Sequence, residues 1–152
     1  MTIAVLRPHS WDFPLFLHVL GATLLFGGML TVTVVGIAAW RRRDVAGLLT
    51  GVAFRTFLIV VIPAFVLMRV AAEWILSREK DQIPGLDNKT WVGIGFIVSD
   101  AGVLVLIALG ILGYFSKRRG GGFTTAAFAV LSTVYLCALA VAWFAMSGKP
   151  GA

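Results

Sequence analysis

The sequence contains few charged residues and a single cysteine. Asp, Glu, Lys and Arg make up 13% of its 152 residues, whereas hydrophobic residues make up 59%. Soluble domains carry roughly 25% charged residues, so this composition argues against an ordinary soluble fold and favours one transmembrane domain over residues 1–152. Cys137 has no second cysteine to pair with, which excludes a disulfide framework within the chain.

The net charge of +6 does not indicate a nucleic-acid partner. The basic residues lie in short clusters between apolar runs, and no polar domain carries them. The expected partner is therefore the lipid bilayer, and we expect no binding of nucleic acid.

Four apolar stretches approach or exceed the roughly 20 residues that a membrane-spanning helix needs, at about 13–39, 54–76, 91–115 and 123–146. The first is too long for a signal peptide, whose apolar region has roughly 7–15 residues. These stretches predict an all-α membrane protein, a four-helix up-and-down bundle. We expect residues 45–53 to form an interfacial turn, and Pro63 to kink the second helix because it cannot donate to the Ile59 carbonyl.

The orientation follows from two basic clusters, at residues 41–43 and 117–119, which lie between the first and second spans and between the third and fourth. Basic loops favour the cytoplasmic side, so both termini are expected outside the cytoplasm. The pattern predicts a multi-pass protein of the cell membrane, with the bacterial inner membrane as its expected location. Tryptophans favour membrane interfaces, and the expected outer belt consists of Trp11, Trp74, Trp91 and Trp143, with Trp40 at the inner interface.

Glycines recur along the first and third spans at spacings that let helix backbones approach closely. We expect packing seams at Gly21, Gly28, Gly36, Gly95, Gly102, Gly110 and Gly113.

Four ionisable residues lie in the outer half of the predicted bundle, and they are the candidate site. At 1.5 Å per residue, Glu73 lies ~5 Å, His18 ~8 Å, Arg69 ~10 Å and Asp100 ~14 Å from the outer ends of their spans. Because a charge at such depth costs roughly 2.5–3.5 kcal/mol on insertion scales, these groups should face partners. One interpretation is a polar pocket that opens outward. The other is an Arg69–Asp100 salt bridge between helices, with Glu73 and His18 reaching the headgroups.

The first span contains the motifs LHVLGA at residues 17–22 and LFGG at residues 25–28. These motifs resemble the first helix of small four-helix bacterial membrane proteins of unassigned function. A similar pattern opens helices in the copper resistance protein D group and in the membrane-bound protoporphyrinogen oxidase group. That resemblance implies a role for His18 in binding haem or a metal.

The other histidine limits what haem could be held. His9 lies nine residues before His18, so on a continuous helix the two would point to opposite sides and could not clamp one haem. A copper interpretation uses the imidazole and sulfur donors of His18, Met68 and Cys137, which suit copper(I).

Three functions are therefore compatible with the sequence. The first is a non-catalytic membrane subunit or scaffold, assembled with other subunits or as a homo-oligomer, and the lack of room for a soluble catalytic domain favours it over an enzyme. The second is a transporter or ligand-binding protein that uses the polar cluster. The third is a redox protein that binds haem or copper through His18.

Overall fold

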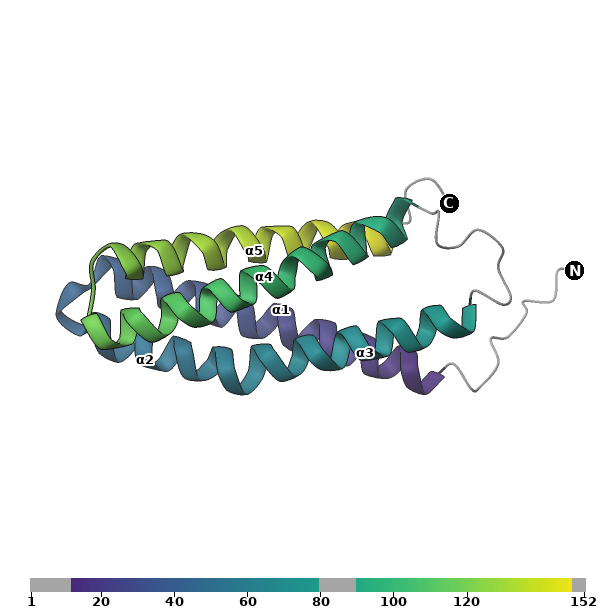
Figure 1. The fold of residues 1–152 in the computed structure, drawn as a ribbon, viewed down its shortest axis with the longest axis horizontal. Coiled ribbons are helices and arrows are strands. Elements are labelled where there is room, and N and C mark those ends of the chain that lie inside the picture. The colour runs from purple at the N-terminus through teal and green to yellow at the C-terminus, as the bar shows by residue number, and fades with distance from the viewer. Residues whose placement is uncertain (1–11, 80–89, 149–152) are drawn as a thin grey trace, which may run out of the picture.

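The protein is a bundle of long antiparallel helices (Figure 1). The structure, a computed structural model, describes residues 12–79 and 90–148. Within these ranges every residue is helical except Arg42 and the turn at residues 120–122. The elements are α1 (Asp12–Arg41), the 3-10 turn η2 (Arg43–Val45), α2 (Ala46–Thr56), the π-helical segment η3 (Phe57–Val61), α3 (Ile62–Glu79), α4 (Thr90–Arg119) and α5 (Phe123–Gly148).

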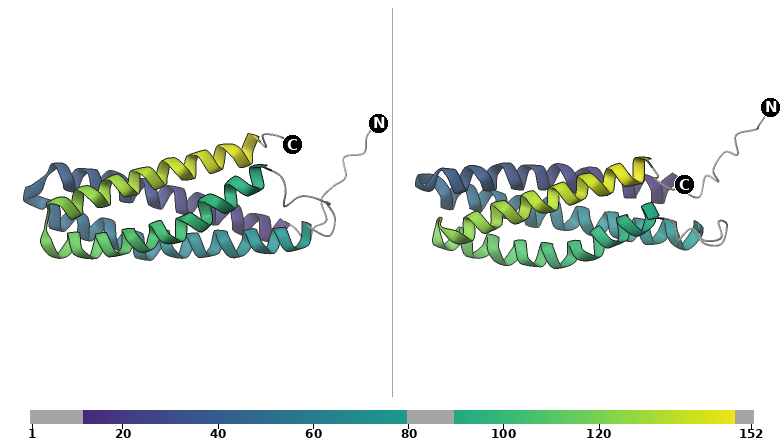
Figure 2. Two further views of the ribbon diagram at one scale, coloured as in Figure 1. Left: turned by 45° about the horizontal axis from the view of Figure 1, so that its top comes forward. Right: turned by 90° about the horizontal axis from the view of Figure 1, so that it is seen from above.

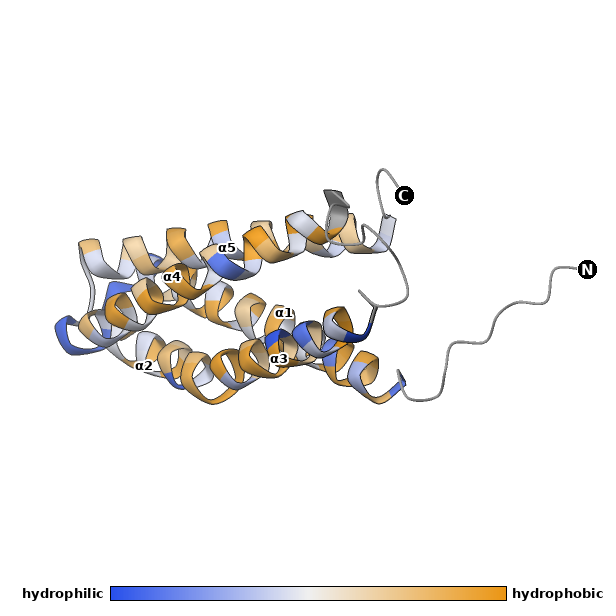
Figure 3. Ribbon diagram, turned by 45° about the vertical axis from the view of Figure 1, so that its right-hand side comes forward, coloured by the Kyte–Doolittle hydropathy of each residue, from blue (hydrophilic) through white to orange (hydrophobic). Residues whose placement is uncertain are grey.

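The predicted helical fold is confirmed at the level of its elements. The described part of the chain has four helical stretches that are long and apolar enough to cross a membrane. Large hydrophobic side chains are exposed along these helices, as lipid contact would require. Hydropathy colouring shows mostly apolar helices and a hydrophilic end where α1 leads into α2 (Figure 3).

The second helical stretch starts earlier than predicted. Residues 45–53 are not an interfacial turn, because α2 begins at Ala46 and continues through η3 into α3. Ala46, Thr50 and Ala53 recur at helical spacing and are buried, so packing stabilises the helix across this segment. A span that began at residue 54 would have placed Arg55 at the helix end, but in the structure Arg55 lies inside the helical stretch. It is exposed ~14 Å beyond the first residue of α2.

Pro63 is accommodated by a π-helical turn. In η3, the Ile62 amide donates to the carbonyl of Phe57, five residues earlier. Pro63 has no amide hydrogen to donate, and the widened turn lies directly before it. The helix is therefore irregular just before the proline, whereas the predicted kink itself stays a prediction.

The glycine seams are confirmed where helices approach one another. A Cβ placed on Gly21 would lie 2.6 Å from the backbone nitrogen of Met68, and one on Gly113 would lie 2.6 Å from the ring of Phe54. Gly36 packs in the same way against the Phe128 side chain. The fully buried centre lies between these seams and is formed by Leu25, Met29, Val32, Phe57, Leu109 and Phe128.

The two ends of the bundle differ in charge and in packing. Residues 41–43 and 117–119 lie at one end, here called the basic end, whereas α1 begins and α5 ends at the opposite end (Figure 1). Near the basic end α4 packs beside α2, and from there it diverges from α3 toward the opposite end (Figures 1 and 2). The side of the membrane on which each end lies stays a prediction.

Candidate functional site

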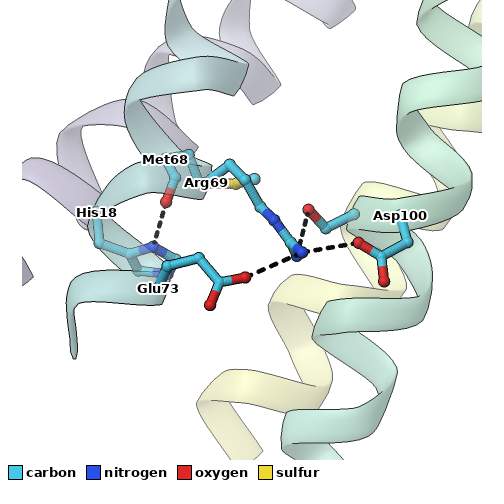
Figure 4. A network of polar contacts seen from close by, with 6 residues as sticks. His18, Met68, Arg69, Glu73 and Asp100 are labelled. Carbon is cyan, nitrogen blue, oxygen red and sulfur yellow. Dashed lines mark hydrogen bonds and ion pairs between the residues drawn. The ribbon is translucent and has the colours of Figure 1, made fainter. Parts of the chain in front are cut away.

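Arg69 on α3 is the centre of a network of polar contacts between α3 and α4 (Figure 4). Its Nη2 atom lies 2.8 Å from Oδ1 of Asp100 and 3.0 Å from Oε1 of Glu73. Glu73 lies one turn after Arg69 on the same helix, the spacing at which opposite charges meet along a helix face. Three of the four predicted site residues are therefore in direct contact.

Two further residues of α4 contact Arg69. Its Nη1 atom donates a hydrogen bond of 3.2 Å to Oγ of Ser99, whose side chain is buried. Its guanidinium carbon lies 4.7 Å from the centroid of the Phe96 ring, within the range of a cation–π interaction. Neither Phe96 nor Ser99 was predicted as a site residue. Phe96 precedes Asp100 by four residues, so the helical spacing could have placed it on the same face.

The position of the helices explains why an arginine connects them. At this level α3 and α4 have diverged, and α4 packs closely against α5 instead (Figures 1 and 2). The long side chain of Arg69 extends across to α4, where it meets Ser99 and Asp100 (Figure 4). A planar guanidinium with five N–H donors can serve several acceptors at once, which a lysine ammonium does less well.

The network is asymmetric in exposure and in charge. The Arg69 side chain is 28% exposed, whereas Glu73 is 52% exposed and Asp100 is 65% exposed. The three groups carry one positive and two negative charges, so the network has one excess negative charge. The site therefore presents partly open carboxylate oxygens, which can accept hydrogen bonds from an additional cation.

The side chain of His18 forms its hydrogen bond outside this network. Its Nδ1 atom lies 3.1 Å from the main-chain oxygen of Met68, which joins α1 to α3 (Figure 4). Because a carbonyl oxygen can only accept, Nδ1 donates this hydrogen bond. The other ring nitrogen, Nε2, takes no part in it. The predicted Arg69–Asp100 salt bridge between helices is present, and His18 and Glu73 both bond to groups on α3. That His18 and Glu73 also reach the lipid headgroups stays a prediction.

The donors proposed for copper occupy different settings. Met68 packs against Gly21 at the α1–α3 contact, whereas Cys137 is a free, exposed thiol on α5. Among the described residues, no three His, Cys, Asp or Glu side chains are grouped closely enough to hold a metal ion. His9 lies outside the described residues. Binding of haem or copper at His18 stays a prediction.

Comparison with known proteins gives no information on the function of this site. No family model, no curated protein and no solved structure matches the chain. The resemblance of the first helix to the copper resistance protein D and protoporphyrinogen oxidase groups also stays a prediction.

Proposed function

We propose that the chain is a non-catalytic subunit of a membrane assembly. In this proposal its four apolar stretches cross the bilayer, and the network around Arg69 binds a transmembrane helix of a partner protein. The partner helix supplies one lysine or arginine, which pairs with the exposed oxygens of Glu73 and Asp100. The proposal combines the scaffold interpretation of the sequence with the polar cluster that the sequence predicted.

The exposure of Asp100 is the observation that supports the proposal most. Asp100 lies ~15 Å beyond the start of α4, and Arg69 lies ~15 Å before the end of α3. Because these helical stretches are longer than a hydrocarbon core of ~30 Å, both residues fall within the half of the core that is away from the basic end. A carboxylate that is 65% exposed at this depth would face lipid or a water-filled gap. Either arrangement is unfavourable by a few kcal/mol relative to a paired, covered carboxylate. Binding of a partner that covers the Asp100 carboxylate is therefore favoured.

The charge of the network determines what the partner must carry. Arg69 neutralises one of its two carboxylates, so a single additional cation completes the balance. In a second copy of this chain, Arg69 and Arg55 are poor sources of that cation. In a parallel copy Arg69 is already paired, and Arg55 lies much closer to the basic end than Asp100 does.

The side chains around the carboxylates fit helix packing. Ile97 and Leu104 flank Asp100 at spacings of three and four residues on α4, and both are exposed. Val66 and Val70 are exposed on α3, seven and three residues before Glu73. On each helix the acidic residue of the network thus lies among exposed apolar neighbours, a pattern that suits an apolar helix with one basic residue.

A synthetic helix can test this proposal without a known partner. The probe is a leucine-rich transmembrane peptide with one central lysine, and its control is the same peptide with leucine at that position. We expect the lysine peptide to associate with the protein in phosphatidylcholine vesicles more strongly than the control, measured by energy transfer between dyes. The preference should disappear in the Glu73→Gln, Asp100→Asn double variant and persist in Asp44→Asn, which alters an exposed carboxylate at the basic end.

Two results would contradict the proposal. Equal association of the lysine and leucine peptides would show that the network does not recognise a helix-borne cation. Competition by a small organic ammonium ion, without any peptide preference, would instead support the ligand-binding or transport alternative. An absorption spectrum of the purified protein tests the redox alternative independently, because a haem band that disappears in His18→Ala would place that alternative first.

A further inference from the structure

The two basic clusters form one surface. A Cβ placed on Gly47, near the start of α2, would lie 3.6 Å from the Cα of Gly120, in the turn between α4 and α5. A Cβ on Gly121 would lie 3.8 Å from the Cβ of Ala46. The two turns therefore touch, and the basic residues on both sides of the contact belong to the same end of the bundle (Figure 1).

Among the described residues, this surface carries a large net positive charge. Its six cations are Arg41, Arg42, Arg43, Lys117, Arg118 and Arg119, all of them exposed. Asp44 is the one carboxylate among residues 41–44 and 117–119, which leaves a net charge of 6 − 1 = +5. Glycines at 120–122 with φ of 63°, 130° and 88° make the turn without adding side chains that would cover these cations.

Two of the arginines point back along the bundle. The guanidinium carbon of Arg118 lies 4.7 Å from the Tyr114 ring centroid, and that of Arg119 lies 5.5 Å from the Phe115 ring centroid. Helical side chains lean toward the N-terminus of their helix, and α4 runs toward the basic end, so both arginines lie over the preceding turn. Their charges are therefore placed where the apolar surface of the helix begins.

We infer that the basic end is a binding site for the phosphate groups of anionic phospholipids, with Arg118 and Arg119 as its central residues. An exposed aromatic ring beside each arginine places the cation at the boundary between apolar and polar surface, which is where lipid phosphates lie. Basic residues next to membrane helices attract anionic headgroups by about 1 kcal/mol each, which corresponds to about fivefold in affinity per cation. This inference does not depend on the partner proposed above.

Trp40 offers a reporter at this surface, because it directly precedes Arg41 and is exposed. The experiment uses a variant that keeps Trp40 and has phenylalanine at the other four tryptophan positions. The probe is brominated phosphatidylglycerol mixed with phosphatidylcholine. We expect it to quench Trp40 more strongly than brominated phosphatidylcholine does at the same mole fraction. Arg118→Gln with Arg119→Gln removes two cations, so it should lower this preference by up to about 25-fold.

Arg78→Gln is the matched control, because the Arg78 guanidinium carbon lies 5.5 Å from the Trp74 ring centroid at the opposite end. This variant should leave the Trp40 preference unchanged. A variant that keeps only Trp143, near the end of α5, should show no preference for the anionic lipid, and this comparison needs no substitution of an arginine. Equal preferences at Trp40 and Trp143 would overturn the inference.

Inorganic phosphate distinguishes a lipid headgroup from free phosphate as the ligand. If phosphate at constant ionic strength leaves the quenching of Trp40 unchanged, the site requires the lipid. If it abolishes the preference while chloride does not, the site binds free phosphate, and the lipid assignment is overturned.

Discussion

Gly21 of α1 and Met68 of α3 lie in backbone contact, with no room for a side chain between them. A Cβ on Gly21 would lie 2.6 Å from the Met68 nitrogen and 2.9 Å from its Cα. Because the neighbouring atoms belong to a helix backbone, they cannot move aside as a flexible side chain could. We expect Gly21→Ala to destabilise the protein by about 1–3 kcal/mol, measured by unfolding in detergent with increasing denaturant.

Gly27 provides the control for this substitution on the same helix. A Cβ at Gly27 meets no atom within 4 Å, so Gly27→Ala adds a methyl group without a clash. It should leave stability unchanged or raise it by up to about 1 kcal/mol, because alanine favours helix more than glycine does. Equal losses for the two variants would show that the α1–α3 contact is looser than described.

The network around Arg69 should give unequal losses when its members are removed. In Arg69→Leu two carboxylates lose their cation, whereas in Asp100→Leu the arginine keeps Glu73 as a partner. We therefore expect Arg69→Leu to lower the free energy of unfolding by a few kcal/mol, and Asp100→Leu to lower it less. The folded yield should fall in the same order. Fluorescence-detected size exclusion would measure the yield of folded protein.

The double variant tests whether Arg69 and Asp100 interact. Removing both should cost less than the sum of the single losses, by about 0.5–3 kcal/mol for groups in contact. Ser77→Ala, which alters an exposed hydroxyl bonded to the Trp74 carbonyl, serves as a control outside the network. Strictly additive losses of Arg69→Leu and Asp100→Leu would mean that the 2.8 Å contact contributes no energy.

Tyr135 buries a hydroxyl group that has no hydrogen-bond partner among the described residues. It packs against Gly102, where a Cβ would lie 2.5 Å from the hydroxyl oxygen. Removing a buried, unpaired polar group relieves a desolvation cost of about 1–3 kcal/mol, so Tyr135→Phe should stabilise the protein. Tyr114→Phe, at an exposed ring, should change little, and a clear loss in Tyr135→Phe would reveal a bonding role of the hydroxyl.

The predicted orientation can be tested at two exposed positions at opposite ends of the bundle, Asp44 and Ser147. In a Cys137→Ala background, a single cysteine replacing Asp44 should resist an impermeant thiol reagent in intact cells. A single cysteine replacing Ser147 should react, because α5 ends on the side away from the basic clusters. The reverse labelling would contradict the positive-inside argument.

The sequence predicted the helices well and one boundary poorly. Apolar runs of about 25 residues predict membrane-length helices directly, because composition and length alone are enough. The start of α2 was missed because Gly47 and Gly51 interrupt the hydrophobic pattern and imitate a loop. Burial of Ala46 and Thr50 stabilises helix there, and that is a tertiary effect which the local sequence does not encode.

The candidate site was predicted in part. The pairing of Arg69 with Glu73 follows from their spacing, and Asp100 was identified because it lies at a similar depth on the next helix. His18 was grouped with them by depth alone, yet it bonds to the Met68 carbonyl. Depth follows from counting residues, whereas the direction in which a side chain faces depends on how the helices are rotated and packed.

The widened turn in η3 also changes the direction in which the side chains of α3 face around the helix axis. Each residue advances an α-helix by ~100°, and a π-helical turn contains about one residue more than an α-helical turn. If residues 57–61 formed a regular α-helix, Arg69 and Glu73 would be rotated by ~100° about the helix axis, away from Asp100. Deleting one residue within η3 and closing the turn to a regular α-helix would preserve their direction, but it would remove the widened turn that precedes Pro63.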